Sequence, residues 1–246
     1  VSRSKWMAQV RICCGSGRSA RAAFPARQPP MAEVADADGP EEEPGGGSLE
    51  EQVEQALAER SRCRDEGDKS GEAAWLLQAA EAYAHGEAYA AALETAQEAE
   101  TLYQEIGDLN GEASALQAAA QVHIWDSKPA DALEVAQQAA LVAQRAEDGS
   151  QEAGLHLLVA QAYMQLNSAG ADPTSNLAIT RGRLAVEAAT TAIKLARKAE
   201  DAELQAYALC ELAQACVAAN RHSEALVAAG EATGLYRMLG DRQGEA

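Results

Sequence analysis

The segment GDKSGEA at residues 67 to 73 decides the fold, because four variants of it follow along the chain. They are GDLNGEA at 107 to 113, EDGSQEA at 147 to 153, a fainter EDAELQA at 200 to 206, and GDRQGEA at 240 to 246. Successive copies are 40, 40, 53 and 40 residues apart, so the third unit carries 13 extra residues. A period near 40 residues in a helical sequence is typical of stacked helix pairs, each of which buries its apolar face only against its neighbours.

The composition favours helices throughout. Ala, Glu, Leu and Gln dominate the 246 residues, aromatic residues make up 4%, and long β-branched runs are missing. We therefore expect an all-α protein.

Small residues recur at equivalent places inside each unit. On the first helix they are Ala80, Ala120, Ala160 and Ala213; on the second they are Ala92, Ala132, Ala185 and Ala225, then Ala99, Ala139, Ala192 and Ala232. Small side chains let two helices approach closely, so these positions predict the crossing of each pair. Larger apolar residues in the same register are expected in the core: Leu76, Leu116 and Leu209; Leu93, Leu133, Val186 and Leu226; Leu102, Val142, Leu195 and Leu235.

These patterns predict a capping helix and four helix pairs. The capping helix spans 48 to 66, where Ser48 and Glu51 form a capping box. The expected pairs are 71 to 86 with 88 to 106, 111 to 126 with 129 to 147, 151 to 167 with 175 to 200, and 202 to 219 with 222 to 239, within repeat units 67–106, 107–146, 147–199 and 200–239. Residues 240 to 246 are expected to open a truncated fifth repeat. The insertion at 167 to 175 is either a partner contact or a tolerated surface loop.

The first 47 residues are expected to be disordered. Residues 1 to 30 contain six bases and no acids, and residues 35 to 47 read ADADGPEEEPGGG, which cannot bury a core. Three interpretations of residues 1 to 30 remain open: upstream sequence ahead of a start at Met31, an organellar transit peptide, or a basic arm.

Charge excludes several classes of partner. From Met31 onward the chain carries 38 acids against 14 bases, which repels phosphate backbones and anionic membrane surfaces. We expect neither nucleic acid nor membrane as a partner, and no apolar run approaches the roughly 20 residues of a bilayer span. Five scattered cysteines fit a reducing compartment, so we expect a cytoplasmic protein, with organellar targeting by residues 1 to 30 as the alternative.

Residues 67 to 239 resemble the tetratricopeptide repeat, in the lengthened form of MalT-type regulators and Partner-of-Inscuteable-like scaffolds. The aligned alanines match the small residues of that pattern, and Tyr83 and Tyr163 match its first-helix aromatic. The chain departs from the pattern where His123 and Cys216 replace that aromatic, and where the frequent proline near the end of the unit is absent. The resemblance implies a right-handed α-solenoid that binds proteins along the concave face of its first helices.

The residues that the resemblance assigns to partner binding lie on the first helices. They are Leu77, Glu81, Gln117, Gln121, Trp125, Leu157, Gln161, Met164, Tyr207 and Gln214, with Gln78, His85, Ile124, Leu158, Cys210 and Glu211 beside them. Amide side chains both donate and accept hydrogen bonds, which suits a peptide backbone, while Trp125, Leu157 and Met164 could supply apolar anchors. The alternative interpretation is that glutamine is merely a good helix former on a solvated face, with Trp125 packed over its own turn.

The same positions speak against one known function of the family, the binding of an acidic chaperone tail. Its co-chaperones hold an acidic chaperone tail with Lys, Arg and Asn, and none of the positions above carries those residues. We therefore expect no carboxylate clamp for such a tail.

No signature of catalysis is found in the sequence. A GxxxxGK phosphate loop, a CxxC pair, HExxH and GxSxG are all missing, so we expect no catalytic residue, cofactor or metal. Two functions remain open: an adaptor or scaffold that takes a partner peptide or helix, and the regulatory or sensor arm of a larger enzyme or transcriptional regulator.

Overall fold

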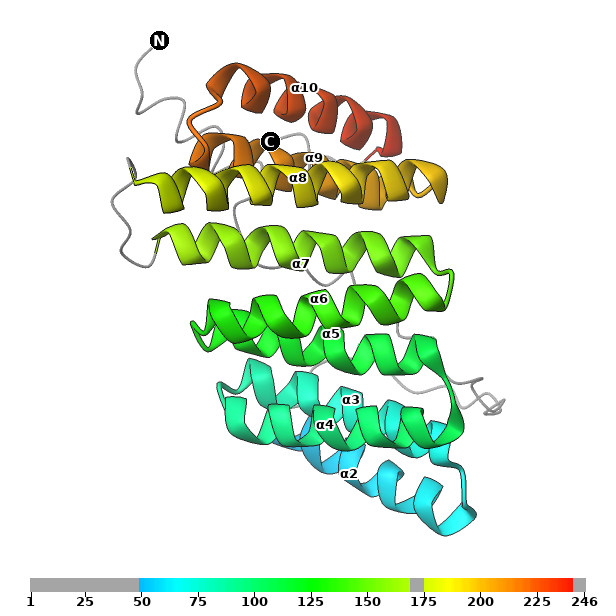
Figure 1. Ribbon diagram of the computed structural model, residues 1–246. Coiled ribbons are helices and arrows are strands. Elements are labelled where there is room, and N and C mark those ends of the chain that lie inside the picture. The colour runs from blue at the N-terminus through cyan, green and yellow to red at the C-terminus, as the bar shows by residue number, and fades with distance from the viewer. Residues whose placement is uncertain (1–48, 169–174, 241–246) are drawn as a thin grey trace, which may run out of the picture.

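The computed structural model describes residues 49–168 and 175–240, and all regular structure within these ranges is α-helical. The helices are α2 (Leu49–Glu66), α3 (Lys69–His85), α4 (Tyr89–Ile106), α5 (Leu109–Trp125), α6 (Pro129–Arg145), α7 (Gly149–Ser168), α8 (Asn176–Lys198), α9 (Ala202–Ala218) and α10 (His222–Leu239). Each predicted helix range overlaps one of these helices, and no boundary differs by more than two residues. The helices stack in chain order (Figure 1).

The packing of the helices gives the stack an inner and an outer layer. The first helices α3, α5, α7 and α9 each contact the next first helix, whereas α4, α6, α8 and α10 make no such contacts with one another. The layer of first helices is therefore the more closely spaced one, and the stack is concave on that side. This arrangement confirms the predicted all-α solenoid.

The repeated Gly-Asp or Glu-Asp pair ends one helix and begins the next. Its first residue has a positive φ of 76° at Gly67, 74° at Gly107, 58° at Glu147, 57° at Glu200 and 73° at Gly240. This left-handed conformation terminates the preceding helix. The aspartate of the pair then accepts a hydrogen bond from the backbone N–H three residues further on, at Gly71, Gly111, Gln151 and Leu204. The motif is thus a helix stop joined to an N-cap, which explains why it recurs at the junctions between pairs.

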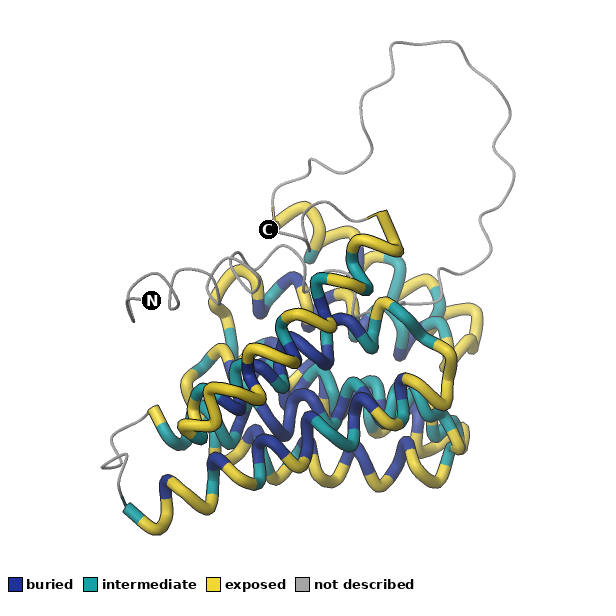
Figure 2. The backbone as a smooth tube through the Cα atoms, turned by 90° about the horizontal axis from the view of Figure 1, so that it is seen from above, coloured by how far each residue is buried: buried dark blue, intermediate teal, exposed yellow. Residues whose placement is uncertain are grey.

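The aligned alanines form the contact between the helices of each pair. All twelve are buried, and none is more than 3% exposed. Seen from above, buried residues line the interior between the two layers and exposed residues cover the outside (Figure 2). Leu76, Leu116 and Leu209 are also buried, as predicted.

The prediction that Leu226 is a core residue was wrong. Its aligned counterpart Val186 is 7% exposed, whereas Leu226 is 56% exposed. The difference arises because α10 packs only on α9 among the described helices, while α8 packs between α7 and α9.

The helix α2 occupies the place that a second helix would take ahead of α3. It is joined to the array by the buried carboxylate of Glu72 on α3, which lies 2.6 Å from Arg64 and 3.5 Å from Arg60. Arg60 also contacts Glu98 of α4 at 2.6 Å. These ion pairs connect α2 to the first helix pair.

Several predictions fall on residues that are not described. Four sets of residues lie outside the described ranges: the segment at 1 to 47 that was predicted to be disordered, the capping-box residue Ser48, most of the insertion (169–174), and all but the first residue of the fifth-repeat segment (241–246). None of the described helices combines the length and apolar character that a bilayer span needs.

Candidate binding surface

The layer of first helices carries most of the predicted partner-binding residues at its surface. Nine of the ten are exposed or half-buried: Leu77, Glu81, Gln117, Gln121, Trp125, Gln161, Met164, Tyr207 and Gln214. Leu157 is different, because its side chain is 2% exposed and packs in a core cluster with Ala153 and Ile193. Leu157 therefore belongs to the core and offers no surface to a partner, and the neighbouring positions Ile124, Leu158 and Cys210 are buried as well.

Basic side chains are nearly missing from this layer. The helices α5, α7 and α9 contain no Lys or Arg, and the only one on α3, Lys69, lies 2.7 Å from Glu105. The polar surface of the first helices consists mainly of amides and carboxylates. Such a surface attracts donors and cations and repels acidic segments.

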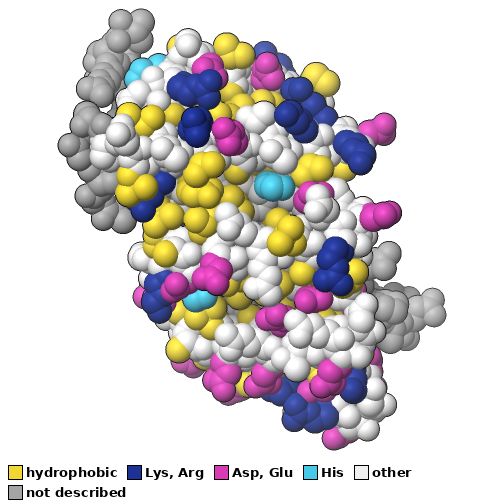
Figure 3. Space-filling model, viewed as in Figure 1, with side chains coloured by type: hydrophobic (Ala, Val, Ile, Leu, Met, Phe, Trp, Pro, Cys, Tyr) yellow, Lys and Arg dark blue, Asp and Glu magenta, His cyan; other side chains and the backbone are white. Residues whose placement is uncertain are grey.

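Charge also changes along the stack. Residues 49 to 148 hold 21 acids and six bases, whereas residues 175 to 240 hold seven acids and seven bases. Figure 3 shows more Asp and Glu side chains in the lower part of the viewed face, where α2 to α6 lie, than in its upper part. The N-terminal half therefore dominates the negative potential of the described residues.

An aromatic ledge lies at the C-terminal ends of α3 and α5. The rings of His85 and Trp125 are 5.3 Å apart between centroids and tilted by 37°. His85 Nε2 lies 3.7 Å from Glu81 Oε1 on its own helix. Trp125 is 38% exposed, so one face of the ledge can stack on a partner group.

Glutamine amides connect successive first helices. Gln151 Nε2 donates to Ser114 Oγ at 2.8 Å and to the Asn110 carbonyl at 3.2 Å, and Gln165 Nε2 donates to the Ile124 carbonyl at 3.4 Å. These hydrogen bonds join α7 to α5. Some glutamine amides of the first helices therefore bind neighbouring helices and not a partner. The sequence pattern alone did not predict these hydrogen bonds.

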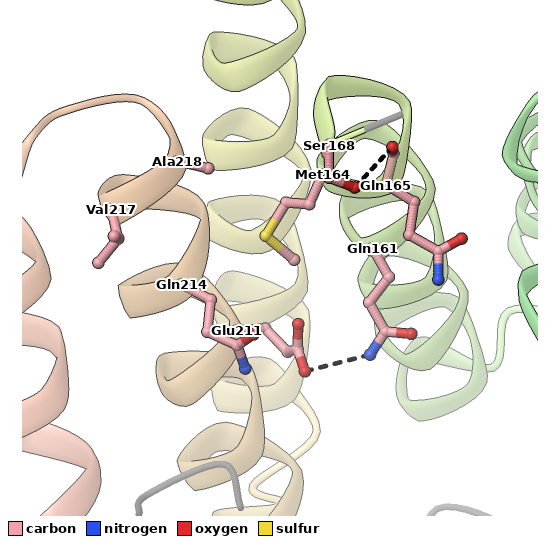
Figure 4. Close-up of a pocket in the computed structure, with 8 residues that line it drawn as sticks. All are labelled: Gln161, Met164, Gln165, Ser168, Glu211, Gln214, Val217 and Ala218. Carbon is pink, nitrogen blue, oxygen red and sulfur yellow. Dashed lines mark hydrogen bonds between the residues drawn. The ribbon is translucent and has the colours of Figure 1, made fainter. Parts of the chain in front are cut away.

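A cleft of about 480 Å³ opens between α7 and α9. Four residues of α7 and four of α9 line it: Gln161, Met164, Gln165 and Ser168, and Glu211, Gln214, Val217 and Ala218 (Figure 4). Of these, Gln161, Met164 and Gln214 were predicted to bind a partner. Gln165 was not, although its spacing of four residues from Gln161 places both on one helix face.

Glu211 lies at the base of this cleft and is 5% exposed. Gln161 Nε2 donates to Glu211 Oε1 at 3.1 Å and to the Tyr207 hydroxyl at 3.0 Å. Burial raises the pKa of the Glu211 carboxyl, and the hydrogen bonds with Gln161 and Tyr207 act in the opposite direction. The other oxygen, Oε2, is buried and has no hydrogen-bond partner among the described residues.

Known proteins resemble this chain only weakly. No protein-family model matches it, and no curated protein matches it either. The crystal structure of the de novo designed helical repeat protein DHR81 is similar, with 21% identity and a TM-score of 0.49 over 71% of this chain and 91% of that one. The crystal structure of BtubC (BKLC) from P. vanneervenii has 14% identity and a TM-score of 0.41 over 79% of this chain and 93% of that one.

Proposed function

We propose that this chain is a protein-interaction scaffold or adaptor that binds a partner peptide or helix along the concave face of its first helices. Tetratricopeptide arrays, which the sequence resembles, work in this way. The observation that carries the proposal is the continuous layer of α3, α5, α7 and α9, whose surface has an aromatic ledge in one half and a cleft in the other.

The chemistry of this layer favours a neutral or basic partner. Three of its four helices carry no Lys or Arg, and acids outnumber bases strongly in residues 49 to 148. An acidic tail would meet like charge and few charged donors on this surface. Trp125 and Met164, both accessible, provide apolar contacts of the kind that dominate peptide binding.

The proposal is tested with two matched triple variants of the full chain. The concave variant carries Trp125→Ala, Met164→Ala and Gln121→Ala. The control variant carries Leu141→Ala, Gln138→Ala and Gln97→Ala, which remove similar side chains from exposed positions on the second helices α4 and α6. Circular dichroism establishes that both variants are as helical as the wild type.

Ligands are selected from a displayed random peptide library on the wild-type chain, and their dissociation constants are measured by fluorescence anisotropy. We expect the concave variant to bind at least about tenfold more weakly, since it loses two apolar contacts, and the control variant to bind like the wild type. Equal binding by the concave variant and the wild type would contradict the proposal.

A further inference from the structure

The Glu211 carboxylate has an unused hydrogen-bonding position in the cleft between α7 and α9. Gln161 donates to its Oε1 and Tyr207 also hydrogen-bonds with the carboxylate, while Oε2 is buried without a hydrogen-bond partner among the described residues. A buried acceptor without a partner is destabilising, and native proteins retain few of them. Figure 4 shows the carboxylate turned into the space between the two helices, on the side where Met164 lies.

The chain supplies no cation for this carboxylate within the cleft. None of the eight lining residues is Lys, Arg or His. On α8, which packs against both walls, the Arg181 guanidinium donates to the Leu166 carbonyl at 3.0 Å. A buried carboxyl either stays protonated or, when ionised, is paired with a cation, so a cationic group from outside the chain would stabilise the ionised form of Glu211.

We infer that the cleft between α7 and α9 is a subsite for a lysine side chain of the partner, whose ammonium group donates to Glu211 Oε2. The inference rests on the proposed function and specifies the chemistry of the bound segment.

The geometry favours lysine over arginine. A guanidinium binds a carboxylate best through two parallel hydrogen bonds, and here Oε1 already accepts from Gln161. An ammonium group is a compact charge that needs only one free carboxylate oxygen, and further acceptors can be taken from the amide oxygens of the lining glutamines. A divalent metal ion is a poorer fit, since it requires several oxygen ligands and the cleft has a single carboxylate.

The walls of the cleft suit the aliphatic part of lysine. Met164, Val217 and Ala218 line it, and they can pack against four methylene groups while the ammonium reaches Glu211. Met164 is unbranched and half-buried, so it can change rotamer to open access to the carboxylate. A lysine side chain would thus contact both the polar base and the apolar walls of the cleft.

The first test needs no partner. n-Butylammonium, which is the lysine side chain alone, is titrated into the full chain with ¹³C-methyl-labelled methionine, and n-butanol serves as the uncharged control. We expect n-butylammonium to shift the Met164 methyl resonance saturably, n-butanol to do so at least about tenfold more weakly, and Glu211→Gln to remove the difference. Equal shifts with the two probes, or an unchanged response in Glu211→Gln, would overturn the inference and leave the proposed function standing.

The second test uses the peptides selected on the concave face. We expect them to contain a lysine whose replacement by norleucine weakens binding to the wild type about tenfold or more but hardly affects binding to Glu211→Gln. Glu203→Gln, which neutralises an exposed carboxylate on the same helix, should behave like the wild type. Concave-face binding without this coupling contradicts only the lysine subsite, whereas binding that survives the concave triple variant contradicts the proposed function.

Discussion

Ionisation of the buried Glu211 carboxyl lowers the free energy of unfolding of the array. Because burial raises the pKa of its carboxyl, the ionised form is less favourable in the folded chain than in the unfolded one. A group whose folded pKa is raised contributes stability that is fully present below its unfolded pKa and is lost as the pH rises through the folded value. The ordinary value is 4.5, so this loss begins in the mildly acidic range.

The variant Glu211→Gln should therefore gain stability relative to the wild type as the pH rises. The glutamine keeps an oxygen that can accept from Gln161, but it never ionises. We expect the free energies of unfolding in urea to be similar at pH 4 and to favour the variant at pH 8. A difference that stays constant between these two pH values would contradict the pKa direction assigned to Glu211.

Sequence periodicity alone did not predict the burial and the partners of individual residues on the concave side. Leu157 and Leu158 are adjacent apolar positions on α7, and both are buried because α7 is packed on both sides as well as by α8. The helical period predicts that both leucines lie on the concave side of α7. It does not show whether a side chain there faces the solvent or packs against the next repeat. The role of Gln161 was hidden for a related reason, since its two acceptors lie 46 and 50 residues further along the chain.

At the scale of the elements, helix junctions are encoded by a pair of residues. The helix-ending position is glycine at Gly67, Gly107 and Gly240, whereas Glu147 and Glu200 adopt the same left-handed conformation with a side chain. A non-glycine residue in this region is strained, at a cost on the order of 1 kcal/mol. At these two positions glycine would therefore be more stable than the glutamate that is present.

Replacing either glutamate by glycine should stabilise the chain. We expect Glu147→Gly and Glu200→Gly each to raise the free energy of unfolding by roughly 0.5 to 1 kcal/mol, with part of the relief offset by the greater freedom of glycine in the unfolded state. Gly107→Ala is the matched reverse change and should be destabilising. Urea unfolding monitored by circular dichroism measures all three, and a loss of stability in both glutamate variants would contradict the assignment.

Elements were the part of the structure most predictable from sequence. The helix stop and the N-cap are local chemistry, so the repeated motif predicted the junctions between helix pairs to within two residues. The close packing of Gly111 on Tyr103 was not predictable, although the glycine belongs to the motif. A Cβ at Gly111 would overlap the Tyr103 ring, and Tyr103 is buried enough to have its pKa raised to about 12. Such a contact between two helices depends on their crossing angle, which periodicity leaves open.

At the scale of the whole molecule, stability is distributed between neighbours. The core is a series of clusters, each joining helices that are adjacent in the stack, and the largest spans α5 to α8. Among the described residues, no helix contacts another that lies more than two helices away along the chain. The free energy of unfolding of such an array is close to a sum of unit and nearest-neighbour terms, so a weakened centre should separate the two ends.

Leu155 and Leu76 allow this expectation to be tested with one kind of substitution. Both are 0% exposed, but Leu155 lies in the central cluster and Leu76 in a cluster near the α2 end. Truncating either to alanine should destabilise the chain by about 2 to 5 kcal/mol. For Leu155→Ala we expect amide hydrogen exchange to give one opening free energy for α2–α5 and a different one for α8–α10, because the central interface no longer couples the two groups of helices.

For Leu76→Ala only the helices around α3 should exchange faster, while the rest of the array stays coupled. Uniformly faster exchange over all described helices in both variants would instead mean that the array unfolds as a single cooperative unit, and the nearest-neighbour description would then be wrong.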